Sequence, residues 1–105
     1  MKKKAHPPSA SHDEGVIEDL RNNPGLAEEF LRIALAEAGD ADGDYLLQKT
    51  LKLLAEARGV AKVAKSAGIP RESLSRALSE RGNPRLSTLQ AVTTALGLRL
   101  TVARV

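Results

Sequence analysis

The sequence predicts a small all-α domain, and three observations support that fold class. Its 105 residues, of which 42% are apolar, suffice for one compact core and are too few for two. Apolar side chains recur at intervals of three and four residues over most of the chain, which is the period of one helix face. Glycine and proline interrupt this pattern often, so the helices are expected to be short and joined by tight turns.

The chain divides into a tail, an acidic extension and a second helical unit. Residues 1–10 contain three lysines and two prolines, a composition typical of a disordered tail. Residues 11–42 predict an acidic N-terminal helical extension, and residues 43–105 predict the unit that carries the functional motif. The expected helices lie at about 12–22, 24–38, 43–58, 60–67, 70–79 and 87–96.

The C-terminal segment, residues 98–105, changes period and predicts a short β-strand. Leu98, Leu100 and Val102 alternate with more polar residues. A lone strand cannot satisfy its own hydrogen bonds. It is therefore expected to pair with a symmetry mate, with another protein or with part of the N-terminal tail. The alternative is a frayed end or an extension that lies on the helices.

Several classes of function lack the residues they need. Cysteine is absent, and the two histidines, His6 and His12, lie in the polar N-terminal region. This excludes thiol catalysis, zinc fingers, a metal cluster and histidine acid–base chemistry. No apolar run reaches the length of about 18 residues that a membrane span needs, and no apolar segment follows the N-terminal lysines as in a signal peptide. We therefore expect a cytoplasmic protein that is not an enzyme and has no cofactor, metal or membrane contact.

Charge is segregated along the chain although its net value is only +3. Residues 5–43 carry nine acidic and two basic side chains, a net charge of −7. Residues 44–105 carry eleven basic and four acidic side chains, a net charge of +7. This asymmetry predicts two surfaces with different partners, an anionic polymer for the second part and a basic protein for the first. The alternative is an ordinary solvated surface.

Residues 60–79 fit a helix-turn-helix motif. Two helices that cross steeply need a small residue at their contact, and the turn needs a residue that tolerates a positive φ. The next residue packs inward, and the second helix buries two positions under the first. These positions are held by Ala64, Gly68, Ile69, Leu74 and either Ala77 or Leu78.

The outward face of the second helix is suited to reading DNA bases. Arginine pairs bidentately with guanine, and glutamate accepts from cytosine or orients an arginine four residues away. The candidate base-reading residues are Arg71, Glu72, Ser75, Arg76 and Ser79. The candidate phosphate contacts, on the first helix and in the loop that follows the motif, are Lys62, Lys65, Asn83 and Arg85. The alternative for each is a solvated polar side chain.

The motif and its flanks resemble the addiction-module antidote proteins, the HigA-like antitoxins of type II toxin–antitoxin pairs. The resemblance rests on residues 57–64, 67–79 with the pattern R-E-S-L-x-x-A-L-S over 71–79, 82–89 with G-N-P-x-L-x-T-L, and 95–100. It covers about residues 13–103 and implies a Cro/C1-type helix-turn-helix. Pro70 departs from the family pattern, which often has a capping Ser or Asn there; this affects how the helix begins but leaves the fold unchanged.

The resemblance implies an antitoxin that represses its own operon and neutralises a RelE/ParE/HigB-like toxin by direct binding. A dimer is expected on geometric grounds, because two recognition helices read the half-sites of a palindromic operator about 34 Å apart. The alternatives are a standalone Cro/C1-type transcriptional regulator without a toxin, and an adaptor that uses the fold for protein contacts alone.

The acidic extension is the candidate surface for a small basic toxin. RelE-like toxins are basic because they bind RNA, so a segment of opposite charge would mask them. Leu26, Phe30 and Ile33 either contact the toxin or fill the core of this chain. For Phe30 and Ile33 the core is the favoured interpretation, which leaves the acidic side chains and the C-terminal strand as the better candidates for partner contact.

Overall fold

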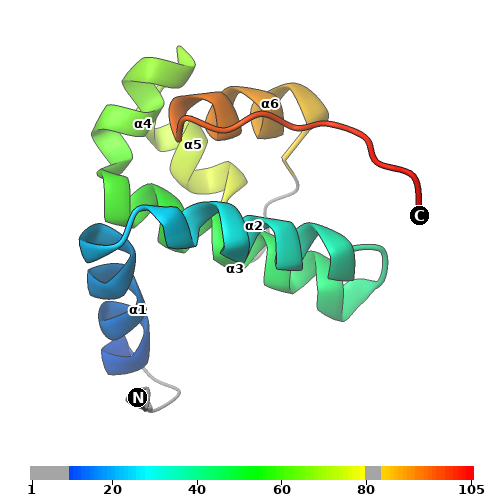
Figure 1. Ribbon diagram of the computed structural model, residues 1–105. Helices are drawn as coiled ribbons and strands as arrows, with labels where there is room; N and C mark the ends of the chain where they lie inside the picture. Colours follow the sequence, from blue (N-terminus) through cyan, green and yellow to red (C-terminus); the bar gives the residue numbers. More distant parts are fainter. Residues whose placement is uncertain (1–9, 80–83) are drawn as a thin grey trace.

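The computed structural model describes residues 10–79 and 84–105 and shows a bundle of short helices. The helices are α1 (Ala10–Asn22), α2 (Gly25–Glu37), α3 (Ala41–Arg58), α4 (Val60–Ala67), α5 (Arg71–Ala77) and α6 (Leu86–Ala95) (Figure 1). Each bound lies within two residues of the range predicted from the sequence, which confirms the all-α class. The predicted N-terminal tail lies outside the described residues except for Ala10, which begins α1.

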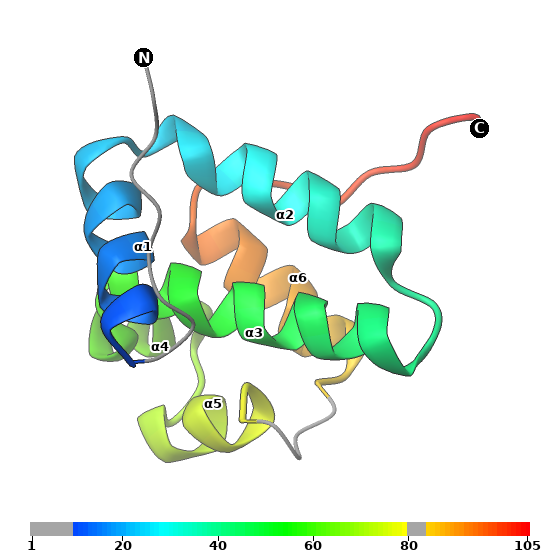
Figure 2. The ribbon, with the colours of Figure 1, turned by 90° about the horizontal axis from the view of Figure 1, so that it is seen from below.

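Helix α3 lies at the centre of the molecule, where it packs against α1, α2 and α4 (Figure 2). Helix α4 in turn packs against α5 and α6. The largest fully buried apolar side chains come from four helices and are Leu51, Leu54, Val63, Leu74 and Val92. Leu20 of α1 and Leu31 of α2 belong to the same cluster, so the acidic extension shares the single core.

Polar contacts hold α1 against the end of α3. The Arg21 guanidinium donates hydrogen bonds to the carbonyl oxygens of Ala57 at 3.2 Å and Glu56 at 3.4 Å. These carbonyls lie in the last turn of α3, where the backbone has no partner within the helix and the helix dipole favours a cation. Further along the same contact, Lys49 Nζ lies 3.2 Å from Asp13 Oδ1.

Helix α3 begins earlier than the predicted start at about residue 43. Asp40 is its N-cap, because the Asp40 carboxylate accepts a 2.8 Å hydrogen bond from the Gly43 N–H. Gly43 thus lies in the first turn and not in a preceding loop. Gly43 also lies close to the end of α2: a Cβ atom there would stand 1.8 Å from the Glu37 carbonyl oxygen.

The apolar face of α2 differs from the expected one. Phe30 is half-buried and packs against the core, as predicted. Ile33 is 51% exposed, so its predicted place in the core is wrong. Leu31 and Ala34 face α3 instead, and a residue two positions from Leu31 points to nearly the opposite side of the helix.

The predicted strand over 98–105 does not form in the single chain. Gly97 takes a φ of 82° after α6, and the Leu98 N–H donates to the Thr93 carbonyl oxygen at 2.9 Å. Beyond Leu98 the backbone forms no helix and, among the described residues, no backbone hydrogen bond. A strand is defined by its ladder, and the described part of the chain offers no second strand to build one.

Candidate nucleic-acid interface

The turn between α4 and α5 is closed by two backbone hydrogen bonds. Gly68 adopts the left-handed conformation at φ 72° and ψ 30°, and its N–H donates to the Lys65 carbonyl at 3.2 Å. The Ile69 N–H donates to the Ala64 carbonyl at 3.0 Å. This pair of bonds is the Schellman motif, which requires a positive φ at the glycine. The turn therefore directs α5 away from α4 in a defined orientation.

The inner positions of the two helices are buried as predicted. Ala64 of α4 is 3% exposed, and Leu74 of α5 is fully buried. The second buried position under α4 is Leu78, at 4% exposed, while Ala77 is half-buried. Pro70 lies at the N-cap of α5 and not within its first turn, and its carbonyl accepts the Leu74 N–H at 3.0 Å. Pro70 thus begins the helix through its backbone carbonyl, without a hydrogen bond from its side chain.

Four of the five predicted base-reading residues, Arg71, Glu72, Ser75 and Arg76, are exposed on α5. Among the described residues neither arginine forms an ion pair, so the proposed pairing of Glu72 with Arg76 is not made in this structure. Ser79 differs, because it is half-buried and its hydroxyl donates to the Arg76 carbonyl at 2.8 Å.

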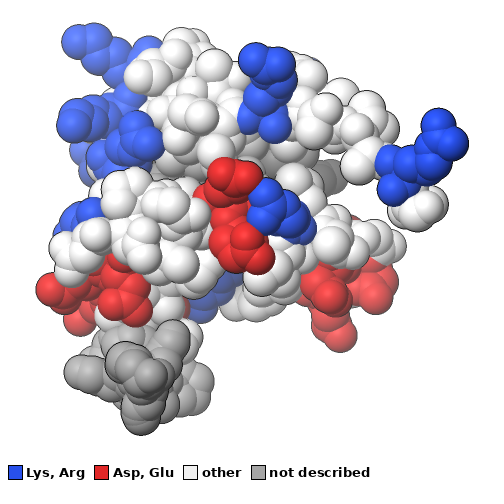
Figure 3. Space-filling view, viewed as in Figure 1, with Lys and Arg blue, Asp and Glu red and all other residues white. Residues whose placement is uncertain are grey.

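The predicted phosphate contacts flank the motif. Lys62 and Lys65 are exposed on α4, and Arg85 is exposed at the N-cap of α6. Asn83 lies outside the described residues. Figure 3 shows Lys and Arg side chains gathered over α4, whereas acidic side chains gather over α1 and where α2 meets α3. On the face that Figure 3 shows, acidic and basic side chains thus gather in different regions.

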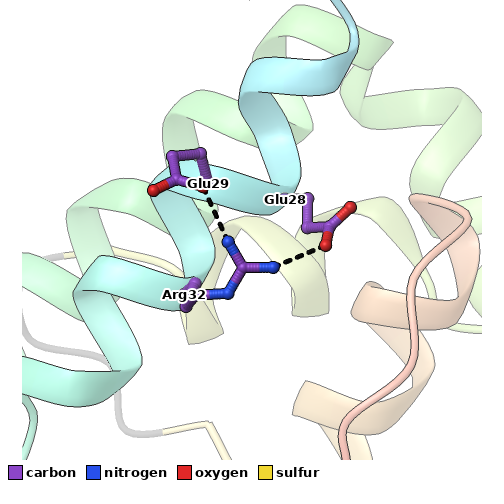
Figure 4. Close-up of polar contacts among 3 residues, drawn as sticks. All are labelled: Glu28, Glu29 and Arg32. Atoms are coloured by element: carbon purple, nitrogen blue, oxygen red, sulfur yellow. Dashed lines mark hydrogen bonds and ion pairs between the residues drawn. The ribbon is translucent and has the colours of Figure 1, made fainter.

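One basic residue of the acidic extension is neutralised locally. The Arg32 guanidinium lies 2.6 Å from a carboxylate oxygen of Glu28 and 2.6 Å from one of Glu29 (Figure 4). All three side chains are more than half exposed, so these pairs add little stability. Their consequence is electrostatic, because two acids and one base leave this surface of α2 negative.

A further residue that the sequence pattern does not identify positions α6. Arg58, in the last turn of α3, donates to the Leu96 carbonyl at 3.1 Å. This bond ties the end of α6 to α3, just before the C-terminal segment begins. Nothing in the spacing of Arg58 distinguishes it from a solvated arginine, because its partner lies 38 residues away.

The described residues contain no group of three or more His, Cys, Asp or Glu side chains arranged to hold a metal ion. No helix in the described part of the chain is both long and apolar enough to cross a membrane.

One of three comparisons with known proteins names a family. The family model described as "Probable addiction module antidote protein" matches residues 15–104. An uncharacterised protein of Haemophilus influenzae is 38% identical over 76 residues, which cover 72% of this chain and 78% of that protein. No solved structure matches the chain significantly.

Proposed function

This chain belongs to the family of probable addiction module antidote proteins, and from that premise we propose how it acts. Membership assigns it the antidote role in a toxin–antitoxin module, a non-enzymatic role with a cognate toxin as partner. The proposal is that it binds a palindromic operator as a homodimer in the cytoplasm, represses its own operon, and neutralises a small basic toxin of the RelE/ParE/HigB-like class by direct contact.

The observation that carries the DNA-binding part is the pair of exposed arginines on α5. Arg71 and Arg76 project from a helix whose start is set by the closed turn at Gly68 and whose inner face is anchored by Leu74. In a Cro/C1-type helix-turn-helix the second helix enters the major groove while the first crosses the backbone. Arg71, Glu72, Ser75 and Arg76 would then face base edges, and Lys62, Lys65 and Arg85 would face phosphates.

Ser79 has a smaller part in this proposal than the sequence suggests. Its hydroxyl hydrogen is already donated to the Arg76 carbonyl, so only the oxygen lone pairs are open to DNA. The phosphate contact proposed for Asn83 is supported by the sequence alone.

The toxin-binding part is supported by charge and by exposed apolar side chains on α2 and α3. Ile33 and Leu35 of α2 and Leu46 of α3 are 51%, 38% and 40% exposed. Glu37 and Asp42 are exposed beside the connection between these helices. Exposed apolar and acidic side chains on the same two helices suit a basic partner that also presents apolar side chains.

A separation-of-function experiment tests the two parts together. The tagged chain is purified from its native host at mild salt, and co-purifying proteins are identified by mass spectrometry. We expect a stoichiometric small basic protein. The triple variant Ile33→Ser, Glu37→Gln, Asp42→Asn should bind that protein about tenfold more weakly, with unchanged operator affinity.

The reciprocal variant Arg71→Ala should lower operator affinity by about 1–3 kcal/mol and bind the toxin with unchanged affinity. If only DNA and the chain itself are recovered, the chain acts as a standalone regulator and the toxin-binding proposal fails. If the triple variant retains full toxin affinity, the toxin binds another surface.

A further inference from the structure

The C-terminal segment, residues 98–105, leaves both its backbone and its apolar side chains without a complete set of partners. The Leu98 side chain packs against the core, and Leu100 is half-buried. The intervening Arg99 and the following Thr101 are exposed, so the segment already alternates between a face toward the helices and a face toward solvent. Val102 continues the inward face yet is 92% exposed.

Space for a neighbouring strand exists beside this backbone. A shallow cavity of about 610 Å³ is lined by Thr94, Gly97, Leu98, Arg99 and Thr101. Among the described residues, no backbone hydrogen bond involves residues 99–105. Free backbone donors and acceptors next to an open groove are the conditions under which another strand is added.

We infer that residues 98–104 of two copies of this chain pair as a two-stranded antiparallel ribbon centred on Thr101. This inference rests on the proposed function, because a repressor of a palindromic operator has to be a dimer. It adds which surface forms that dimer. An isolated pair of strands is only marginally stable in water. Here the ribbon would be anchored at both ends, because Leu98 of each copy is held on its own helical core.

Symmetry favours a second copy as the occupant of the groove. In an antiparallel pair, residues opposite one another point to the same face. A two-fold axis through the ribbon therefore pairs only residues whose numbers are both even or both odd. Arg99 of one copy therefore never stands opposite Arg104 of the other. These two like charges do not repel each other directly across a symmetric pair.

Registers centred on Thr101 and on Val102 each pair seven residues, 98–104 and 99–105. The register centred on Thr101 keeps Leu98, which packs against the core, within the ribbon. It places Leu100 of each copy opposite Val102 of the other, on the face toward the helices. The Val102 side chain, which is exposed in the single chain, would thereby pack against Leu100 of the other copy. Cross-strand apolar pairs of this kind stabilise a ribbon beyond its backbone hydrogen bonds.

The position of the segment leaves the candidate DNA-reading helix uncovered. Figure 2 shows the C-terminal segment and α5 on opposite sides of the molecule, with α6 between them. Two copies joined through their C-terminal segments would therefore keep both α5 helices free.

Single cysteine substitutions test the ribbon directly, because the chain has no cysteine of its own. Each residue from 99 to 103 is changed to cysteine in turn, and disulfide-linked dimer is measured under mild oxidation without DNA or toxin. Only the residue on the two-fold axis lies opposite itself, at a Cα separation of about 5 Å that permits a disulfide. One residue away the separation is about 8 Å, and two residues away it is about 14 Å.

We expect Thr101→Cys to cross-link at least about tenfold faster than Arg99→Cys or Ala103→Cys. Equal rates along the segment would overturn the ribbon, and so would a maximum at another residue. The toxin and operator assays above do not depend on this readout, so failure of the ribbon is distinguishable from failure of the proposed function.

A matched pair of charge substitutions gives a second readout. Val102→Asp and Ala103→Asp introduce the same charge at adjacent exposed positions, so in a single chain both are expected to be harmless. In the ribbon only residue 102 faces the helices, where an unpaired carboxylate is costly to bury. Sedimentation of the full chain should show a dimer that Val102→Asp dissociates and Ala103→Asp retains. A monomeric wild-type chain at about 100 μM, or equal behaviour of both variants, contradicts the inference; pairing seen only after toxin is added would assign the segment to the toxin instead.

Discussion

At the scale of single residues, Arg71 and Arg76 are the sharpest test of DNA reading. Each is exposed on α5 and has no ion-pair partner among the described residues, so neither must break a contact to reach DNA. Arg71→Ala and Arg76→Ala should each lower operator affinity by about 1–3 kcal/mol and relax base preference at one position. Fluorescence anisotropy with operator and random duplexes of equal length measures this difference.

Arg32→Ala is the matched control for the loss of one positive charge. Arg32 lies on α2 between Glu28 and Glu29 and should not contact DNA. Equal losses on operator and random DNA for the α5 variants would contradict base reading and leave only an electrostatic role.

Lys62 and Lys65 are expected to contribute affinity without specificity. They are exposed on α4, the helix that would cross the phosphate backbone. Lys62→Ala and Lys65→Ala should weaken binding to all duplexes alike, and each should reduce the slope of log affinity against log salt by about one unit. Titrations at several salt concentrations give this slope, and an unchanged slope would place the lysines outside the interface.

At the scale of elements, the contact between α2 and α3 depends on one glycine. A Cβ atom at Gly43 would stand 1.8 Å from the Glu37 carbonyl, and a backbone atom cannot move aside without separating the two helices. Gly43→Ala should lower the free energy of unfolding by about 3 kcal/mol, at the upper end for overpacked sites. Urea denaturation followed by circular dichroism measures the change.

Gly25→Ala is the control for this prediction. Gly25 begins α2, and a Cβ atom there would meet only the Asn23 side chain at 3.6 Å, an ordinary contact. Alanine at a compatible helical position is neutral or stabilises by up to about 1 kcal/mol. Similar stabilities for the two variants would contradict this close approach of α2 and α3.

At the scale of the whole molecule, three candidate surfaces occupy different regions of one small fold. The candidate DNA-reading helix α5 and the C-terminal segment lie on opposite sides (Figure 2), and acidic side chains gather where α2 meets α3 (Figure 3). The single core joins all six helices, so the acidic extension cannot separate freely from the rest. This arrangement would allow toxin, operator and a second copy to be bound without competing for the same residues.

The positions of the helices and of the turn at Gly68 follow from the sequence alone. Helical periodicity and the conformational preferences of glycine and proline act within a few residues, and they place every helix to within two residues of its observed bounds. The exposure of Arg71 and Arg76 follows for the same reason, because residues outside the apolar stripe of a helix point to solvent.

Only the tertiary structure decides which apolar residues of α2 are buried, how α1 and α6 are held, and what becomes of residues 98–105. Leu31 and not Ile33 faces the core because α3 lies on that side of α2. The contacts of Arg21 and Arg58 join residues 35 or more positions apart, and local spacing carries no information about such pairs. An alternating pattern likewise indicates a capacity for pairing, whereas a strand exists only where a second backbone supplies the hydrogen bonds.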